Sequence, residues 1–88
     1  MFSTELFGLR LQEVRKLHND TQKDLGAIVG TRQTNVSEME SGKRTTTAEN
    51  IAKICRHYNV SADYLLGLSD DPRGGRERWT DEERRESE

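Results

Sequence analysis

The side chains that could act as nucleophiles, general bases or metal ligands are few in this sequence and lie apart. There is one cysteine, Cys55, and there are two histidines, His18 and His57. Catalysis by serine or cysteine needs a neighbouring histidine and acid, and a zinc site needs several Cys or His residues at short spacing. The sequence shows neither pattern and has no glycine-rich phosphate loop. We therefore expect no enzyme, no catalytic residue, no metal site and no cofactor.

A denser group of hydrogen-bonding side chains lies between residues 32 and 44. Val36 and Met39 are three residues apart, so a helix over residues 32–41 would turn both to one face. The side chains left for the other faces are polar, and Lys43 and Arg44 follow directly. The polar residues of the segment are Arg32, Gln33, Thr34, Ser37 and Glu38. The chemistry that this segment offers is therefore binding and not catalysis.

Helical periodicity dominates the chain around this segment. Apolar residues recur every three or four positions in the first stretch, at Phe7, Leu11, Val14 and Leu17. Similar spacing predicts five helices in all, at about residues 4–18, 22–29, 32–41, 48–58 and 62–66. No segment alternates with a period of two, so we expect no strands. The predicted fold is all-α, a compact five-helix domain.

Capping residues set the ends of these helices. Thr21 and Asp24 form a capping-box pattern, and Thr47 and Ser61 are further residues able to cap free backbone N–H groups. Gly30 stands where the chain must turn tightly, and Asn59 suits a left-handed helix exit. The turn at Gly30 leaves almost no linker between the second and third helices.

Composition divides the chain in two. Of the 27 apolar residues, 26 precede Ser69, and only Trp79 follows it. Residues 1–68 carry 9 Lys and Arg against 8 Asp and Glu, whereas residues 69–88 carry 5 against 8. We therefore predict a folded domain at 1–68 and a charged, flexible tail at 69–88, with a capping pattern for one short helix at residues 80–87.

The compartment follows from what the sequence lacks. A single cysteine forms no internal disulfide, and the first residues have no basic segment of the kind that opens a signal peptide. No apolar stretch approaches the roughly 18 residues of a membrane span. We expect a cytoplasmic protein that does not contact a membrane.

Two short helices joined by a tight glycine turn, the second with polar outer side chains, are typical of the helix-turn-helix, whose second helix lies in the major groove of DNA. Residues 7–67 also resemble one family of this kind without a gap. The resemblance rests on Phe7-Gly8-x-Arg10-Leu11-x-x-Val14-Arg15, Thr21-Gln22-x-x-Leu25-Gly26, Val29-Gly30, Val36-x-x-x-Glu40-x-Gly42-Lys43-Arg44 and Val60-Ser61-x-Asp63-x-Leu65-Leu66-Gly67. The chain is similar to the Cro and phage-repressor type of helix-turn-helix protein, the lambda-repressor-like, xenobiotic-response-element class.

The resemblance implies a role for each matching position. Arg32, Gln33 and Thr34 match base-contacting positions, with Ser37 and Glu38 one turn further along. Gln22, Lys43 and Arg44 match positions that contact phosphate. Arg10 and Glu40 match a pair that forms an internal salt bridge. The chemistry agrees in part, since Arg suits guanine, Gln suits adenine and the Thr methyl group can contact thymine.

Glu38 and Arg32 depart from the family pattern in the region of the third helix. A carboxylate at Glu38 would repel phosphate, so it either accepts a hydrogen bond from cytosine or pairs with a neighbouring Arg or Lys. Arg32 stands where a small capping residue is usual, and Thr31 is a candidate to cap the helix in its place.

These observations lead to two functional hypotheses. The first is a sequence-specific regulator of transcription, a repressor, that binds double-stranded DNA as a homodimer; Tyr64, Leu65 and Leu68 are the candidate interface, unless they face inward and close the core. The second is an antitoxin-like or other protein-binding regulator that uses the acidic tail with Trp79 to bind a protein partner.

Overall fold

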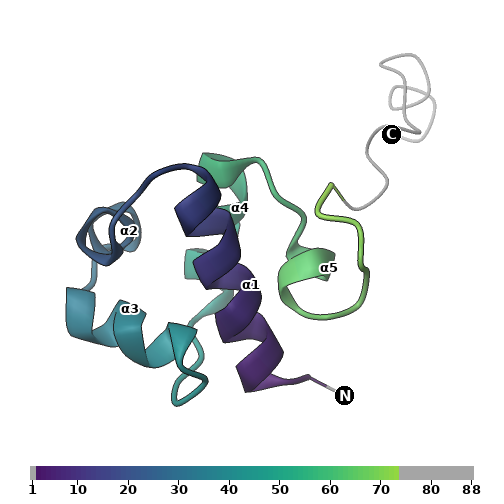
Figure 1. The fold of residues 1–88 in the computed structure, drawn as a ribbon, viewed down its shortest axis with the longest axis horizontal. Helices are drawn as coiled ribbons and strands as arrows, with labels where there is room; N and C mark the ends of the chain where they lie inside the picture. Colours follow the sequence, from purple (N-terminus) through teal and green to yellow (C-terminus); the bar gives the residue numbers. More distant parts are fainter. Residues whose placement is uncertain (1, 74–88) are drawn as a thin grey trace.

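A computed structural model of the chain describes residues 2–73 and folds them into five α-helices (Figure 1). In chain order these are α1 (Thr4–Leu17), α2 (Gln22–Val29), α3 (Gln33–Glu40), α4 (Ala48–Tyr58) and α5 (Ala62–Leu65). The all-α fold predicted from the sequence is confirmed, and each helix end lies within one residue of its predicted position. The predicted short helix at residues 80–87, and Trp79, lie outside the described residues.

The predicted caps explain why the helices end where they do. The Thr21 hydroxyl accepts a hydrogen bond from the Asp24 backbone N–H, and the Asp24 carboxylate accepts one from the Thr21 N–H, at 3.1 and 2.9 Å. Thr47 and Ser61 also cap the helices that follow them. Gly30 ends α2 in the left-handed region, with φ of +73°. These local interactions fix the chain direction between helices.

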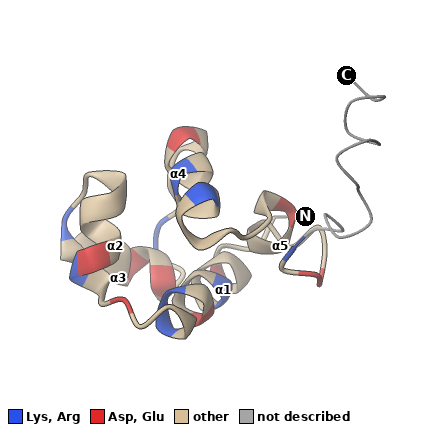
Figure 2. Cartoon of the chain, turned by 90° about the horizontal axis from the view of Figure 1, so that it is seen from above, with Lys and Arg blue, Asp and Glu red and all other residues tan. Residues whose placement is uncertain are grey.

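Acidic and basic residues are mixed over the surface. Seen from above, both blue and red segments occur on α1, α2 and α4 (Figure 2). The bounds of α3 contain two acidic residues, Glu38 and Glu40, and no Lys or Arg. Any attraction of this molecule to a polyanion therefore depends on where individual charges lie.

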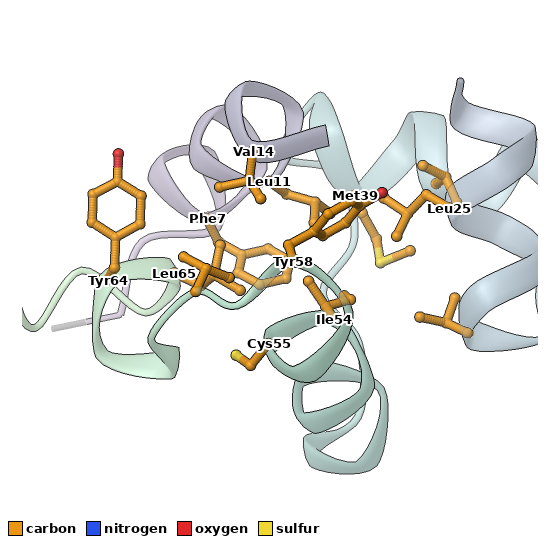
Figure 3. Packing of buried hydrophobic residues seen from close by; sticks show 13 residues of the cluster. Phe7, Leu11, Val14, Leu25, Met39, Ile54, Cys55, Tyr58, Tyr64 and Leu65 are labelled. Carbon is orange, nitrogen blue, oxygen red and sulfur yellow. The ribbon is translucent and has the colours of Figure 1, made fainter. Parts of the chain in front are cut away.

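One apolar core joins all five helices. Phe7, Leu11 and Val14 of α1 lie over Ile54 and Tyr58 of α4, with side chains from α2, α3 and α5 at the two ends (Figure 3). The full cluster comprises Phe7, Leu11, Val14, Leu25, Val29, Val36, Met39, Ile54, Cys55, Tyr58, Val60, Tyr64 and Leu65. The core orients α2 and α3 relative to α1.

Helix α1 approaches the end of α3 very closely, and a glycine makes this possible. A Cβ atom on Gly8 would lie 2.6 Å from the backbone oxygen of Glu40, a separation that real contacts of this kind do not show. The missing side chain lets the two backbones nearly touch. This contact sets the angle at which α3 leaves the core.

Residues 69–73, which we name the strap, are bonded to the helical body. The Arg10 guanidinium donates hydrogen bonds to the backbone oxygens of Tyr64 and Ser69, and the Ser61 N–H donates to the Pro72 oxygen. The composition boundary at residue 68 thus places these five residues in the tail, whereas the structure holds them against α1 and α5. The side chain of Arg10 in α1 donates a hydrogen bond to the strap at Ser69. Composition does not reveal such a contact between distant parts of the chain.

The residues expected to form a dimer interface mostly face inward. Leu65 is fully buried and Tyr64 is 7% exposed, and both belong to the core cluster. Only Leu68 is exposed, at 73%. The apolar surface expected from these three residues is therefore reduced to one side chain. None of the helices within residues 2–73 has both the length and the apolar character needed to cross a membrane.

Candidate nucleic-acid interface

Helices α2 and α3 are joined by a turn of three residues and pack directly on each other. A Cβ atom on Gly26 would lie 2.8 Å from the Thr31 backbone oxygen, so the turn folds back onto α2 at a position where only glycine fits. The Thr31 N–H donates to the Gly26 oxygen and closes the end of α2. The helix-turn-helix predicted from this glycine turn is therefore present.

Helix α3 is buried on one face and open on the other. Val36 and Met39 are 0% and 2% exposed and hold the helix on the core. Gln33, Thr34 and Ser37 are exposed, as is Arg32 just before the helix. The positions predicted to contact bases thus lie together on the solvent side of one helix, with Glu38 half-buried at its edge.

Gln22 connects the start of α2 to both ends of α3. Its Nε2 donates to the Glu40 carboxylate at 3.1 Å, and its Oε1 accepts from Gln33 Nε2 at 3.1 Å. The amide of Gln33 is therefore held in one orientation by a neighbour that is itself held by Glu40. Fixing a long side chain in advance lowers the rotamer entropy that would be lost on binding.

Glu40 is anchored by Arg15 and not by Arg10. The Arg15 guanidinium donates to both carboxylate oxygens of Glu40, at 2.6 and 2.9 Å, and its third nitrogen donates to the Asp20 backbone oxygen. The two side chains are 9% and 3% exposed. Hydrogen bonding to Glu40 raises the pKa of Arg15 above its usual value. The predicted Arg10–Glu40 pair is wrong.

The rotation of α1 explains this error. Gly8, which touches the end of α3, and Arg15 are seven residues apart, which puts them on the same side of a helix. Arg10 lies on another side and faces α5, where it pairs with Asp70 at 2.8 Å and lies 4.1 Å from the centroid of the Tyr64 ring. The spacing from Gly8 was the sequence signal that pointed to Arg15.

The second carboxylate of α3 is also paired. Glu38 forms an ion pair with Arg44 at 3.0 Å, and both side chains are about half exposed. Of the two possibilities left open for Glu38, pairing with a neighbouring cation is the one present in this structure. Lys43 is exposed beside the pair. With both carboxylates of α3 compensated, the helix offers less repulsion to an approaching phosphate.

The start of α3 lacks the expected side-chain cap. Arg32 is the N-cap residue and makes no capping hydrogen bond, and the Thr31 hydroxyl accepts from the Asn35 side chain at 2.6 Å instead of capping the backbone. A polar groove lies beside this bond, between the end of α3 and the start of α4; its lining includes Asn35, Arg44 and Thr46. The free N–H groups at the start of α3 are left open to a ligand or to water.

Comparison with known proteins relates this geometry to a family. The model of a helix-turn-helix family, HTH_3, matches residues 11–65. The chain is 33% identical over 63 residues to the HTH-type transcriptional regulator YobD of Bacillus subtilis, covering 72% of this chain and 56% of that protein. It is 32% identical over 62 residues to the antitoxin PezA of Streptococcus pneumoniae, covering 70% and 39%. The chain thus spans about half or less of these relatives.

A solved structure agrees with the fold. The P22 c2 repressor, in complex with a synthetic operator, superposes with a TM-score of 0.68 at 30% identity, covering 73% of this chain and 97% of that one. The similarity in fold extends over most of the described residues. The structure to which this chain is similar was solved with the repressor bound to operator DNA.

Proposed function

Because this chain belongs to the helix-turn-helix family HTH_3, a family of DNA-binding regulators of transcription, we propose that it is a repressor that inserts the exposed face of α3 into the major groove of a specific DNA site. Regulation of transcription through DNA binding is the activity of the family. Repression, and the assignment of specificity to particular residues, are our proposal. The P22 c2 repressor, which is similar in fold and 30% identical, supports repression.

The bonded chain from Arg15 through Glu40 and Gln22 to Gln33 is the observation that carries the proposal. It joins a buried ion pair to an exposed amide over four side chains of α1, α2 and α3. Nothing in the core requires an exposed glutamine to be held in this way. A preoriented amide suits the paired donor and acceptor of an adenine edge, N6 and N7.

Neighbouring residues receive roles from their chemistry. We assign base contacts to Arg32, Gln33, Thr34 and Ser37, since they are exposed on or beside α3. Glu38 acts at the edge of this set, where its pairing with Arg44 competes with any contact to cytosine. Phosphate contacts are assigned to the cations after α3 and to the start of α2: Gln22, Lys43 and Arg44.

Two copies on one DNA site complete the proposal. One helix of eight residues reaches only a few base pairs, whereas two copies related by a two-fold axis read twice as many. Leu68 is the exposed apolar side chain that remains from the predicted interface. We assign it to the contact between copies.

Selection of bound sequences from a random DNA pool tests the function. The full chain should enrich one motif with two-fold symmetry. A control chain with Gln33→Ala and Thr34→Ala alters two exposed side chains and should keep its fold by circular dichroism while losing that motif. A pool that stays random with the parent chain at low salt would overturn the proposal.

A second candidate function rests on the likeness to the antitoxin PezA, at 32% identity. In this alternative, the acidic segment with Trp79 binds a protein partner while the helical body binds DNA. Removing residues 74–88 separates the two, because it spares Asp70 and the strap that Arg10 holds. DNA binding that survives with loss of a co-purifying partner would favour this function.

A further inference from the structure

One groove of the molecule is left without a role by DNA binding. It lies between the last turns of α1 and α4 and the strap, and Val14, Leu17, His18, Tyr58, Val60 and Pro72 line it. None of the lining residues belongs to α2 or α3. We name it the end groove.

The end groove has the lining of an aromatic-binding site. Leu17 is 74% exposed although it is large and apolar. The rings of His18 and Tyr58 lie against each other, with centroids 4.8 Å apart, and the rings of His57 and Tyr58 meet edge to face, with centroids 4.7 Å apart. The Tyr58 hydroxyl donates to Asp20 at 2.8 Å. Burial and this hydrogen bond raise the pKa of Tyr58, so its ring stays neutral.

The chain itself leads into this groove. Pro72 and Arg73, the last described residues, form part of its wall. Trp79, the one tryptophan of the sequence, follows Arg73 by six residues. Six residues of extended chain span about 20 Å. The intervening Gly74 and Gly75 restrict the direction of the backbone least of all residue types. The segment between Arg73 and Trp79 is therefore long enough for the indole to return to the groove.

Charge also favours the segment around Trp79 as the occupant of the end groove. Lys16 and Arg56 lie in the last turns of α1 and α4, the two helices whose ends contribute to the groove, and form no ion pair within residues 2–73. Asp81, Glu82 and Glu83 follow Trp79 after one residue, Thr80. A tryptophan seated between the helix ends would carry these carboxylates toward the two cations.

We propose that the end groove is the docking site of the Trp79 indole, so that the segment after the strap folds back onto the ends of α1 and α4. The indole packs on Leu17 and Tyr58, and the acidic residues that follow lie near Lys16 and Arg56. The inference is independent of DNA binding, because its residues lie outside α2 and α3. Its failure would leave the proposed function unchanged.

Trp79 is its own reporter, since no other tryptophan contributes to the fluorescence of the chain. In the folded full chain its emission should lie to the blue of the urea-unfolded chain and resist quenching by acrylamide. Leu17→Asp should shift the emission to the red and restore quenching to the unfolded value. Leu9→Asp is the matched control: Leu9 is also on α1 and 60% exposed but does not line the groove, so this variant should keep the parent emission.

Circular dichroism of each variant checks that the helices remain. A double-mutant cycle measured by thermal unfolding gives a second readout. Leu17→Asp should lower the unfolding midpoint more in the parent than in a Trp79→Ala chain, because only the parent has the contact to lose. Emission of the folded parent equal to that of the unfolded chain would overturn the proposal. So would a blue shift that fades on dilution, which would assign the indole to a second copy.

Discussion

Gln33 and Lys43 differ in what they can do for DNA binding, although both are exposed near α3. Gln33 is oriented by Gln22 and can form two hydrogen bonds with one base edge, whereas Lys43 is a charge that suits any phosphate. Gln33→Ala should weaken binding to the preferred site by about 1 to 3 kcal/mol and relax the preference at one base pair. The measurement is affinity across a panel of sites that differ at single positions.

Lys43→Ala should instead weaken binding to every sequence alike and reduce the salt slope of the affinity by about one unit. Arg56→Ala removes an exposed cation from the last turn of α4 and serves as the charge-matched control, for which affinity should stay near that of the parent. If Gln33→Ala and Lys43→Ala give the same profile across the panel, the division into base and phosphate contacts fails.

The two ion pairs of α1 should differ sharply in their effect on stability. Glu40→Gln leaves the Arg15 guanidinium buried without its carboxylate, and breaking a buried pair on one side costs about 3 kcal/mol or more. Asp70→Asn is the control, because Asp70 is fully exposed and water replaces its contact with Arg10. Denaturant unfolding should show a large drop in the midpoint for Glu40→Gln and little change for Asp70→Asn. Equal midpoints for the two variants would contradict the buried role of Glu40.

At the scale of the helices, the contact of α1 with the end of α3 leaves no room for an added side chain. Gly8→Ala would place a Cβ atom 2.6 Å from the Glu40 oxygen, and two backbones cannot yield as a side chain does. Overpacking of this kind costs about 1 to 3 kcal/mol, which outweighs the better helix propensity of alanine, about 1 kcal/mol. We expect a lower melting temperature for Gly8→Ala. Leu9→Ala, a change at an exposed neighbour, should melt close to the parent.

Helix positions could be predicted from the sequence because their ends depend on neighbouring residues. Thr21 with Asp24 starts α2, Gly30 ends it, and Thr47 starts α4, each within a few residues of the group that it satisfies. Such local rules need no knowledge of the tertiary fold. The same holds for the exposed face of α3, which the spacing of Val36 and Met39 determines.

Contacts between helices could not be predicted in the same way. Whether Arg10 or Arg15 meets Glu40 depends on how α1 is rotated against α3, and both residues are arginines on one helix. The hydrogen bonds from Arg10 to the strap join residues 59 positions apart. A four-residue helix gives no period from which to tell its inner side, so the sequence alone does not show that Tyr64 and Leu65 face the core. Each of these contacts depends on how the helices pack in three dimensions, which neighbouring residues in the sequence do not determine.

For the whole molecule, net charge gives little attraction to DNA. The formal charge of the sequence is −2, and the cations on α1, α2 and α4 are mixed with carboxylates (Figure 2). Among residues 2–73, a single copy therefore depends for its affinity on the few cations beside α3 and on direct contacts. Because two linked copies bind the second half-site at a high effective concentration, pairing on DNA compensates for weak single contacts.

This reasoning predicts the form of the operator and its response to one substitution. Two copies on one face of the duplex place their half-sites about 10 base pairs apart, centre to centre. Leu68→Asp should weaken binding to such a site strongly while leaving binding to an isolated half-site unchanged, because Leu68 is exposed and far from α3 in the chain. Footprinting of the parent should protect both half-sites, with two copies per duplex in sedimentation. Protection of one half-site by one copy at saturating protein would show that the chain acts alone.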